Sequence, residues 1–259
     1  MCLITFLPAG VQPDPTRLHT GAQYNSDGHG FAIVTGDDLI VEKGLDGETL
    51  VAAFTRARRN HPDGPALFHS RLRTHGPIDV DNCHPFAVGG DRRTMIAHNG
   101  ILPRAVHPRR GDPRSDTRIL AEDHLPRLGS AHLRRTRLRL ERWMGPNNLM
   151  VLLTVDRRYR QQAHLFNESR GIWDEGVWYS NDSYLPPLHS SRRYHAFTDL
   201  GGDEPIGWAP AWSSPLRCAS CGALTDAEEA WCAWCDRCWA CGELPTRCTC
   251  WAPAVLRHQ

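Results

Sequence analysis

The chain has 259 residues and a formal net charge of +1, so it is long enough to bury a substantial core. A net charge so close to zero argues against general electrostatic attraction to nucleic acid or to an anionic membrane. No apolar run reaches the roughly 20 residues that span a bilayer, and the N-terminus lacks the charged region of a signal peptide. We therefore expect a cytoplasmic protein without a membrane partner, whose ten cysteines are reduced, metal-bound or catalytic rather than disulfide-bonded.

Strands are predicted in the first hundred residues wherever a short apolar run ends in a polar turn. The runs are Leu3–Leu7, His29–Thr35, 39–42, 66–71 and 94–98. The second and third flank the turn GDD and are expected to form a hairpin. Between the third and the fourth, the helical spacing of apolar residues over 49–59 predicts a helix.

Helices and further strands are predicted beyond residue 100. Ser115 is a suitable N-cap for a helix through His124, with Asp116 in its first turn, where the helix dipole favours negative charge. A second helix is predicted over Arg134–Met144, and its arginines are interpreted as a solvated face, with a nucleic-acid or partner patch as the alternative. Strands then follow at 148–155, 163–166 and 177–180. This irregular order indicates stacked sheet and helix layers rather than a parallel βαβ repeat.

The C-terminal part differs in composition from the rest. Residues 201–217 are rich in Gly, Pro and Ser and are predicted to be a linker between a domain over 2–200 and a small module over 218–251. Eight of the ten cysteines lie in this module, as three Cys-x2-Cys pairs and one Cys-x-Cys pair. They are Cys218 and Cys221, Cys232 and Cys235, Cys238 and Cys241, and Cys248 and Cys250.

The cysteine spacing predicts metal binding. Two closely spaced thiolates can bind one ion, and two such pairs complete a tetrahedral Cys₄ shell, so eight cysteines indicate about two structural zinc ions. The sequence leaves open how the eight cysteines divide between the two sites. An iron–sulfur cluster or a redox dithiol uses similar spacings and is the alternative. The module resembles a double zinc ribbon. Four thiolates would fill the coordination shell of each zinc ion and leave no position for a catalytic water molecule.

Polar motifs follow Cys2 through the larger domain. They are NSDGHGFAI (25–33), HSRLRTHG (69–76), NCHPF (82–86), HNG (98–100) and SDT (115–117). Together with Cys2, and in this order, they resemble class II glutamine amidotransferases, the N-terminal-nucleophile glutaminase domains of glucosamine-6-phosphate synthase, glutamate synthase and small stand-alone relatives. The resemblance covers about residues 2–200 and implies an α+β fold, a four-layer αββα N-terminal-nucleophile hydrolase sandwich.

The chemistry of Cys2 fits this resemblance. A thiol is a good nucleophile only after a base has taken its proton. If Met1 is removed, Cys2 carries its own base, a free α-amino group with a pKa of about 8. The resemblance further implies that Asn99 and the Gly100 backbone N–H donate hydrogen bonds to the oxyanion that forms on attack.

The resemblance also implies a pocket for an amino acid head group. Arg71 is suited to bind the α-carboxylate with its two-pronged guanidinium, and Asp116 to bind the ammonium group. Thr74 and His75 are implied as further lining residues. The alternatives are ordinary structural roles: an Arg71–Asp116 ion pair, a core histidine at His98, and a simple tight turn at Asn99–Gly100.

Some positions carry structural expectations, and some depart from the family. Asn25, Asp27 and Gly30 are expected to form a supporting turn, and Cys83 to be a buried structural thiol. Arg118 follows Thr117 where many family members have Glu. Leu72 and Arg73 replace the tryptophan or alanine that often follows the arginine of the pocket.

The sequence therefore predicts an enzyme that hydrolyses L-glutamine to glutamate and ammonia through a γ-glutamyl thioester on Cys2. No second catalytic domain is visible, so we expect a separate synthetase or amidoligase to accept the ammonia, docked through the zinc ribbon. No organic cofactor is expected. The alternatives are a hydrolase of another γ-glutamyl amide, or a non-catalytic zinc-ribbon adaptor that binds protein or nucleic acid.

Overall fold

The computed structural model describes residues 2–128, 132–186, 216–217 and 224–225. The chain divides into two units, Met1–His195 and Ala196–Gln259. In the second unit, the described residues form the antiparallel pair β11 (Leu216–Arg217) and β12 (Leu224–Thr225). The eight cysteines of the predicted zinc module lie outside the described residues, as does most of the predicted linker.

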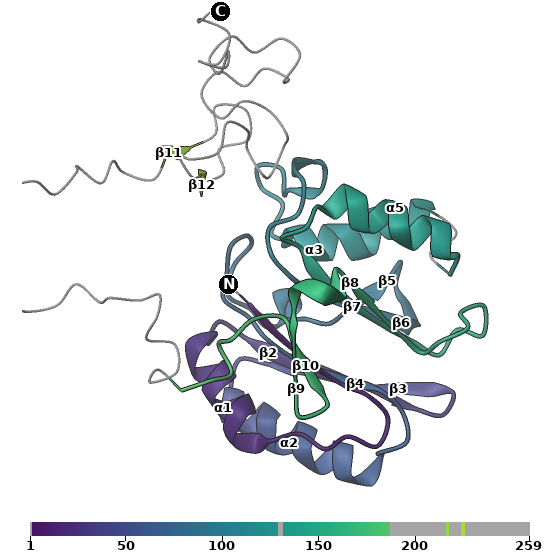
Figure 1. The fold of residues 1–259 in the computed structure, drawn as a ribbon. Coiled ribbons are helices and arrows are strands. Elements are labelled where there is room, and N and C mark those ends of the chain that lie inside the picture. The colour runs from purple at the N-terminus through teal and green to yellow at the C-terminus, as the bar shows by residue number, and fades with distance from the viewer. Residues whose placement is uncertain (1, 129–131, 187–215, 218–223, 226–259) are drawn as a thin grey trace, which may run out of the picture. The chain divides into compact units, whose positions relative to one another are not determined.

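Two antiparallel sheets form the first unit (Figure 1). The six-stranded sheet has the order β3-β2-β4-β1-β10-β9. Its strands are β1 (Leu3–Leu7), β2 (His29–Thr35), β3 (Asp38–Gly44), β4 (Ala66–Ser70), β9 (Ile172–Asp174) and β10 (Val177–Tyr179). The four-stranded sheet has the order β5-β6-β7-β8. Its strands are β5 (Phe86–Val88), β6 (Asp91–Asn99), β7 (Leu149–Thr154) and β8 (Ala163–Phe166).

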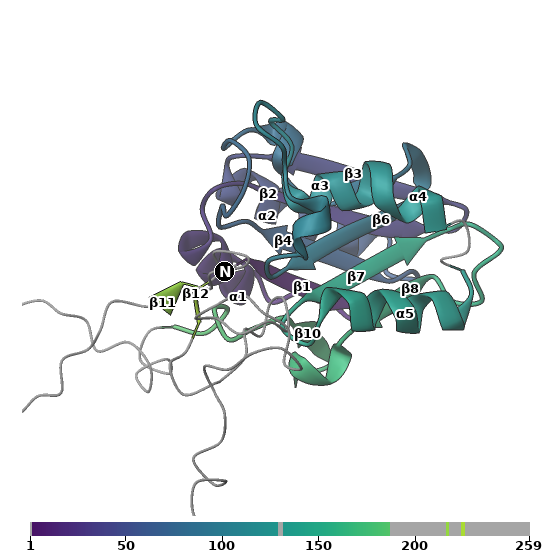
Figure 2. The ribbon, with the colours of Figure 1, turned by 90° about the horizontal axis from the view of Figure 1, so that it is seen from above.

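Helices lie on both sides of the paired sheets (Figures 1 and 2). The first pair is α1 (Pro15–Tyr24) and α2 (Gly47–Asn60), and the second group is α3 (Asp116–Ile119), the π-helical turn η3 (Leu120–His124), α4 (Leu125–Leu128) and α5 (Arg134–Met144). Short 3₁₀ turns lie at η1 (Val80–Asn82), η2 (Arg104–Val106) and η4 (Glu168–Arg170). No helix within the described ranges is long and apolar enough to cross a membrane.

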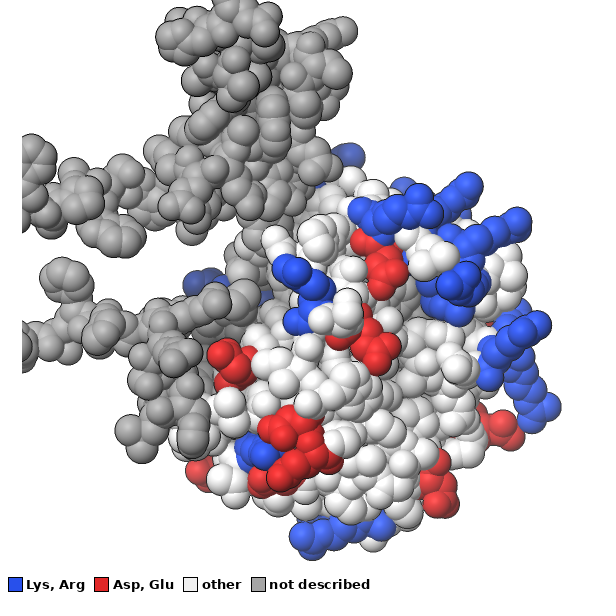
Figure 3. Space-filling view, viewed as in Figure 1, with Lys and Arg blue, Asp and Glu red and all other residues white. Residues whose placement is uncertain are grey.

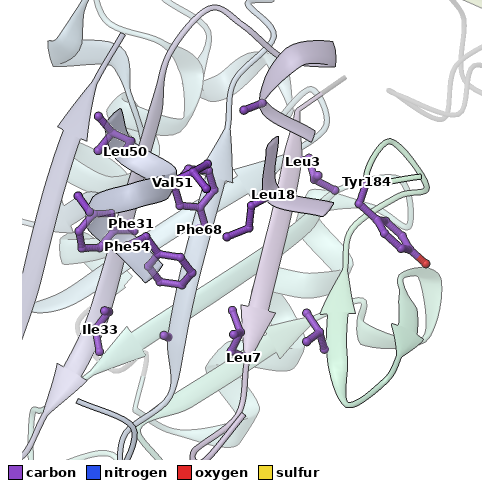
Figure 4. Packing of buried hydrophobic residues seen from close by; sticks show 14 of the residues in the cluster. Leu3, Leu7, Leu18, Phe31, Ile33, Leu50, Val51, Phe54, Phe68 and Tyr184 are labelled. Atoms are coloured by element: carbon purple, nitrogen blue, oxygen red, sulfur yellow. The ribbon is translucent and has the colours of Figure 1, made fainter. Parts of the chain in front are cut away.

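Three apolar clusters separate these layers. Alternation along β1 sends Leu3 and Leu7 toward α1 and α2, and Ile4 and Phe6 toward the second sheet. Figure 4 shows the first cluster, in which Phe54 of α2 packs against strand side chains. A third cluster fills the space between the four-stranded sheet and α3–α5. The order of the layers is therefore helix, sheet, sheet, helix, and the predicted α+β class is confirmed.

Most predicted elements are confirmed. Leu3–Leu7 and Arg134–Met144 have the expected bounds, and β2 and β3 pair as a hairpin whose turn is Gly36–Asp37, since Asp38 already belongs to β3. The helix after Ser115 continues past His124 through the π-helical turn into α4. The sequence analysis missed α1, β5 and β9.

The arginine-rich helix α5 matches the interpretation of a solvated face. Its buried residues are Leu140 and Met144, whereas four of its arginines are exposed: Arg134, Arg135, Arg139 and Arg142. Figure 3 shows basic side chains gathered over this part of the surface.

Candidate active site

The strand pattern brings Cys2 and Asn99 to the same space between the two sheets. Cys2 precedes β1 by one residue, and because side chains alternate along a strand, it shares the inward face of Ile4 and Phe6. Asn99 ends β6 on the face of Met95 and Ala97, which belong to the same cluster between the sheets. The two residues therefore lie at the edge of one buried layer, on opposing sheets.

A small cavity opens at this edge. It is lined by Cys2, Arg71, Leu72, Thr74, His75, His84, His98, Gly100, Ser115, Asp116 and Thr117. Six of the residues predicted for catalysis and substrate binding are among them, and the seventh, Asn99, adjoins Gly100. The free volume is about 10 Å³, roughly the space that one water molecule needs. Glutamine therefore does not fit unless the surrounding segment moves.

Cys2 is buried, and both its side-chain sulfur and its backbone carbonyl oxygen form hydrogen bonds. Its Sγ donates to Leu72 O at 3.5 Å, and its carbonyl oxygen accepts from Asn181 Nδ2 at 2.7 Å. Burial raises the pKa of the Cys2 thiol above its ordinary value, although the nearby Arg71 charge acts in the opposite direction. The thiol is therefore protonated at neutral pH unless a neighbouring base takes its proton.

Arg71 follows β4 and is 2% exposed. Its guanidinium donates to Pro77 O at 2.9 Å and to His75 O at 2.8 Å. Its backbone N–H donates to Gly28 O at 2.8 Å, which anchors the residue to the start of β2. Arg71 thus holds the 72–78 segment over the cavity, and the donors predicted to bind a carboxylate are in contact with backbone carbonyls.

Asp116 occupies the first turn of α3. Its carboxylate accepts from Thr117 N at 2.8 Å and from Leu102 N at 3.1 Å, and Ser115 caps the same helix by accepting from Arg118 N. Asp116 Oδ2 lies 3.9 Å from His75 Nδ1, within ion-pair distance. Within the described ranges Arg71 and Asp116 form no ion pair, so the alternative of an ordinary salt bridge between them is wrong.

Asn99 and Gly100 do not form the simple hairpin turn that was the alternative. The chain passes from Gly100 into η2, and the next strand paired with β6 after this point is β7 (Leu149–Thr154). Gly100 has φ +134°, and a Cβ there would lie 2.5 Å from Asn148 Oδ1. Only glycine fits this position. Asn99 Nδ2 donates to Ser180 Oγ at 3.1 Å, and its buried Oδ1 has no hydrogen-bond partner.

Histidines border the cavity. His98 has both ring nitrogens in hydrogen bonds, with Thr117 Oγ1 at 3.1 Å and Asn148 Oδ1 at 2.9 Å, as expected of a core histidine. His84 is buried with neither ring nitrogen hydrogen-bonded, and its ring lies 3.9 Å from that of His69. Burial lowers the pKa of His84 well below its ordinary value and that of His69 to about 3. These imidazoles are therefore neutral at physiological pH.

The segment that was expected to form a supporting turn, Asn25–Gly30, contacts residues next to the cavity. Asp27 Oδ2 accepts from Arg73 N at 2.8 Å, and Asn25 Nδ2 donates to Gly21 O at 2.9 Å. A Cβ at Gly30 would lie 2.1 Å from His84 O, so the absence of a side chain allows that segment to approach β2. Gly30 lies within β2 and not in the turn, so the turn as predicted is wrong at this position, whereas Asn25 and Asp27 do lie between α1 and β2.

Cys83 and Arg118 lie outside the cavity lining. The Cys83 thiol is buried and donates to Asp79 O at 3.3 Å. Arg118 pairs with Glu122 at 2.7 Å along its own helix. Arg118, which stands where many family members have Glu, therefore does not contribute to the cavity lining.

Sequence reasoning missed Ser180 and Asn181, which contact Asn99 and Cys2 respectively. They lie in the run SNDS (180–183), which follows β10 in the sequence. A polar cluster immediately after an apolar strand was the sequence signal that could have identified them. His84, which lies in the motif NCHPF, was not predicted as a lining residue either.

No protein-family model and no curated protein matches the chain. Solved structures do. A glutamine phosphoribosylpyrophosphate amidotransferase from B. subtilis, complexed with ADP and GMP, is similar over 69% of this chain and 41% of its own, with 14% identity and a TM-score of 0.41. An allosteric regulatory enzyme of purine biosynthesis matches over the same shares, with 15% identity and a TM-score of 0.41.

A class-II glutamine aminotransferase domain protein from Silicibacter pomeroyi matches over 60% of this chain and 73% of its own, with 18% identity and a TM-score of 0.32. The chain thus spans less than half the length of the first two proteins. The similarity is to class II glutamine amidotransferase domains, at low sequence identity, and it concerns the fold.

Proposed function

We propose that the chain is a class II glutamine amidotransferase that hydrolyses L-glutamine to glutamate and ammonia, with Cys2 as an N-terminal nucleophile. One observation carries the proposal. Four separate stretches of sequence contribute Cys2, Arg71 with His75, Gly100 and Asp116 to the same buried cavity. A nucleophile, a cation, an anion and a backbone turn held by glycine are the groups that this reaction needs together.

The first step is formation of the thiolate. In the active chain Met1 is absent, and the α-amino group of Cys2 accepts the Sγ proton. The thiolate attacks the side-chain carbonyl carbon of glutamine, and the carbonyl electrons move to its oxygen. Asn99 Nδ2 and the Gly100 N–H donate to this oxyanion.

The second step releases the products. The tetrahedral intermediate collapses, the C–N bond breaks, and the α-ammonium returns its proton to the departing ammonia. A γ-glutamyl thioester remains on Cys2. Water then attacks the thioester carbonyl as the α-amine takes one of its protons. The C–S bond breaks, the proton passes from the α-ammonium to the sulfur, and glutamate leaves with its second proton released to solvent.

The substrate head group is bound by opposite charges. Asp116 binds the ammonium, and Arg71 binds the α-carboxylate after exchanging carbonyl contacts in the 75–77 segment for the substrate. Because the cavity has room for about one water molecule, it must enlarge before the substrate enters.

We further propose that ammonia passes to a separate synthetase or amidoligase, and that the eight C-terminal cysteines bind two zinc ions. The zinc proposal rests on the cysteine spacing in the sequence. Zinc binding would stabilise the fold of the module, and the folded module would bind a partner protein. No step of glutamine hydrolysis involves the zinc ions.

An assay of ammonia and glutamate release tests the proposed function. The purified protein should release both from L-glutamine in equal amounts, and Cys2→Ala should abolish the reaction. Cys83→Ala, which removes a buried thiol outside the cavity lining, should retain it. The proposal is wrong if the wild-type protein is folded, lacks Met1 and leaves L-glutamine intact.

A further inference from the structure

A buried serine joins the two strands that carry the proposed nucleophile and oxyanion donor. Ser180 follows β10, and its N–H donates to Ile4 O at 2.9 Å. Its Oγ accepts from Ile4 N at 2.9 Å and from Asn99 Nδ2 at 3.1 Å. Ser180 is 5% exposed and Asn99 4% exposed. One hydroxyl oxygen therefore connects β1, directly after Cys2, to the end of β6.

The Ser180 hydroxyl is a fixed acceptor. A hydroxyl oxygen has two lone pairs, and these two N–H groups use both. The Ile4 N–H belongs to a strand that pairs on both sides, with β4 and with β10, so it holds Ser180 Oγ in place. An acceptor anchored in this way sets the position of the Asn99 amide nitrogen.

The Asn99 carboxamide has little else to orient it. Its Oδ1 is buried without a hydrogen-bond partner, so within the described part of the chain Ser180 supplies its side-chain hydrogen bond. An NH₂ group carries two N–H donors. With one donated to Ser180, the second is left for another acceptor at the cavity edge.

We propose that Ser180 is a positioning residue, which holds the Asn99 carboxamide so that its second N–H donates to the oxyanion formed on attack by Cys2. This inference rests on the proposed function. Ser180 acts through Asn99 and does not touch the substrate. Its removal should therefore reduce transition-state stabilisation and leave binding of glutamine unchanged.

A purely structural role has a different signature. Loss of the hydroxyl also leaves the buried Ile4 N–H without its side-chain acceptor, which lowers stability whether or not Asn99 is affected. Thr94→Val is the matched control, because it removes a buried hydroxyl hydrogen bond, to Thr154 at 2.9 Å, near the other end of β6. It should lower the melting temperature and keep kcat.

A double-mutant cycle tests the proposal. Asn99→Ala should lower kcat by roughly 100- to 1000-fold, the effect of losing one oxyanion donor. Ser180→Ala should lower kcat by about 10-fold or more, the effect of a misplaced catalytic group. In the Asn99→Ala background, the same serine change should lower kcat by less than about 2-fold, because the group that it positions is gone.

Ser180→Cys is the second variant, since it keeps the side chain nearly the same size and replaces the oxygen by a weak acceptor. It should reproduce the kcat loss with KM unchanged. The inference is overturned if the folded Ser180 variants keep the wild-type kcat, if they change KM alone, or if the serine change has its full effect without Asn99. A wild-type protein that does not hydrolyse glutamine would instead overturn the proposed function.

Discussion

Burial of Cys2 makes its reactivity depend on a base. The thiol has a pKa raised by burial, so few molecules carry a thiolate at neutral pH. In the proposed mechanism the α-amine of the same residue supplies the base, and it can accept a proton only when it is itself neutral. A 2.7 Å hydrogen bond from Asn181 Nδ2 holds the Cys2 carbonyl oxygen in place.

This arrangement predicts a pH profile that rises. Below the pKa of the α-amine, about 8, kcat/KM should increase roughly tenfold per pH unit, because the neutral amine becomes more abundant. Initial rates from pH 5.5 to 9 measure the profile. A rate that is constant or falls between pH 6 and 8 contradicts it.

Two charged residues are predicted to select the amino acid head group. Arg71→Lys removes the two-pronged guanidinium, and Asp116→Asn removes the charge for the ammonium, so each should raise KM for glutamine by about 10-fold or more. Steady-state kinetics measure the change, and melting temperatures report whether the 72–78 segment still folds. Arg118→Lys is the control, since Arg118 pairs with Glu122 outside the cavity lining. If both site variants keep wild-type kinetics, the head group binds elsewhere.

At the scale of elements, the strands and longer helices could be predicted because their signals are local. Leu3–Leu7 is a continuous apolar run, and Ser115 caps the helix that starts at Asp116 as expected. Helix α1 was missed because its buried positions are Leu18, Gly21 and Ala22, which give a weak apolar stripe. The N-terminus of α1 gave a stronger sequence signal for the helix. Asp14 is its N-cap and accepts a hydrogen bond from Thr16 N, and Pro15 occupies the first helical position.

The residues after β10 that contact β1 and Asn99 could not be predicted in the same way. Ser180 contacts Ile4 across 176 positions of sequence, and Asn181 contacts Cys2 across 179. No periodicity or local motif contains such information. The residues that line the cavity could be predicted to lie together because they occur in short motifs. The hydrogen bonds that hold them depend instead on which strands become neighbours.

A buried arginine ties helix α2 to two loops. Arg58 is completely buried, and its guanidinium donates to Val11 O at 2.9 Å, to His61 O at 3.0 Å, to Pro8 O at 2.6 Å and to Gly64 O. Arg58→Lys keeps the charge but loses the planar fork. Each buried carbonyl left without a donor costs about 1–3 kcal/mol, so the free energy of unfolding should fall by at least about 2 kcal/mol.

Chemical denaturation measures this effect. Arg59→Lys, one position further along α2, is exposed and should change the free energy of unfolding by less than about 0.5 kcal/mol. Equal stability of the two variants would show that the carbonyl contacts of Arg58 do not stabilise the fold.

For the whole molecule, the cavity beside Cys2 and the cysteine-rich segment belong to different units. All cavity residues come from Met1–His195, whereas the eight cysteines lie within Ala196–Gln259. We predict about two zinc ions per chain by elemental analysis of the purified protein. Cys218→Ser with Cys221→Ser should remove about one of them and leave glutamine hydrolysis intact. Iron in place of zinc, or loss of hydrolysis in a folded variant, would contradict this prediction.

Covalent labelling tests directly whether the chain acts through an N-terminal cysteine. The active protein is treated with a glutamine-analogue electrophile, and its intact mass and N-terminal peptide are determined by mass spectrometry. We predict one adduct, on Cys2, in a chain that has lost Met1, with loss of activity in proportion to labelling. An adduct on Cys83, or full glutaminase activity in a protein that quantitatively retains Met1, would contradict the account.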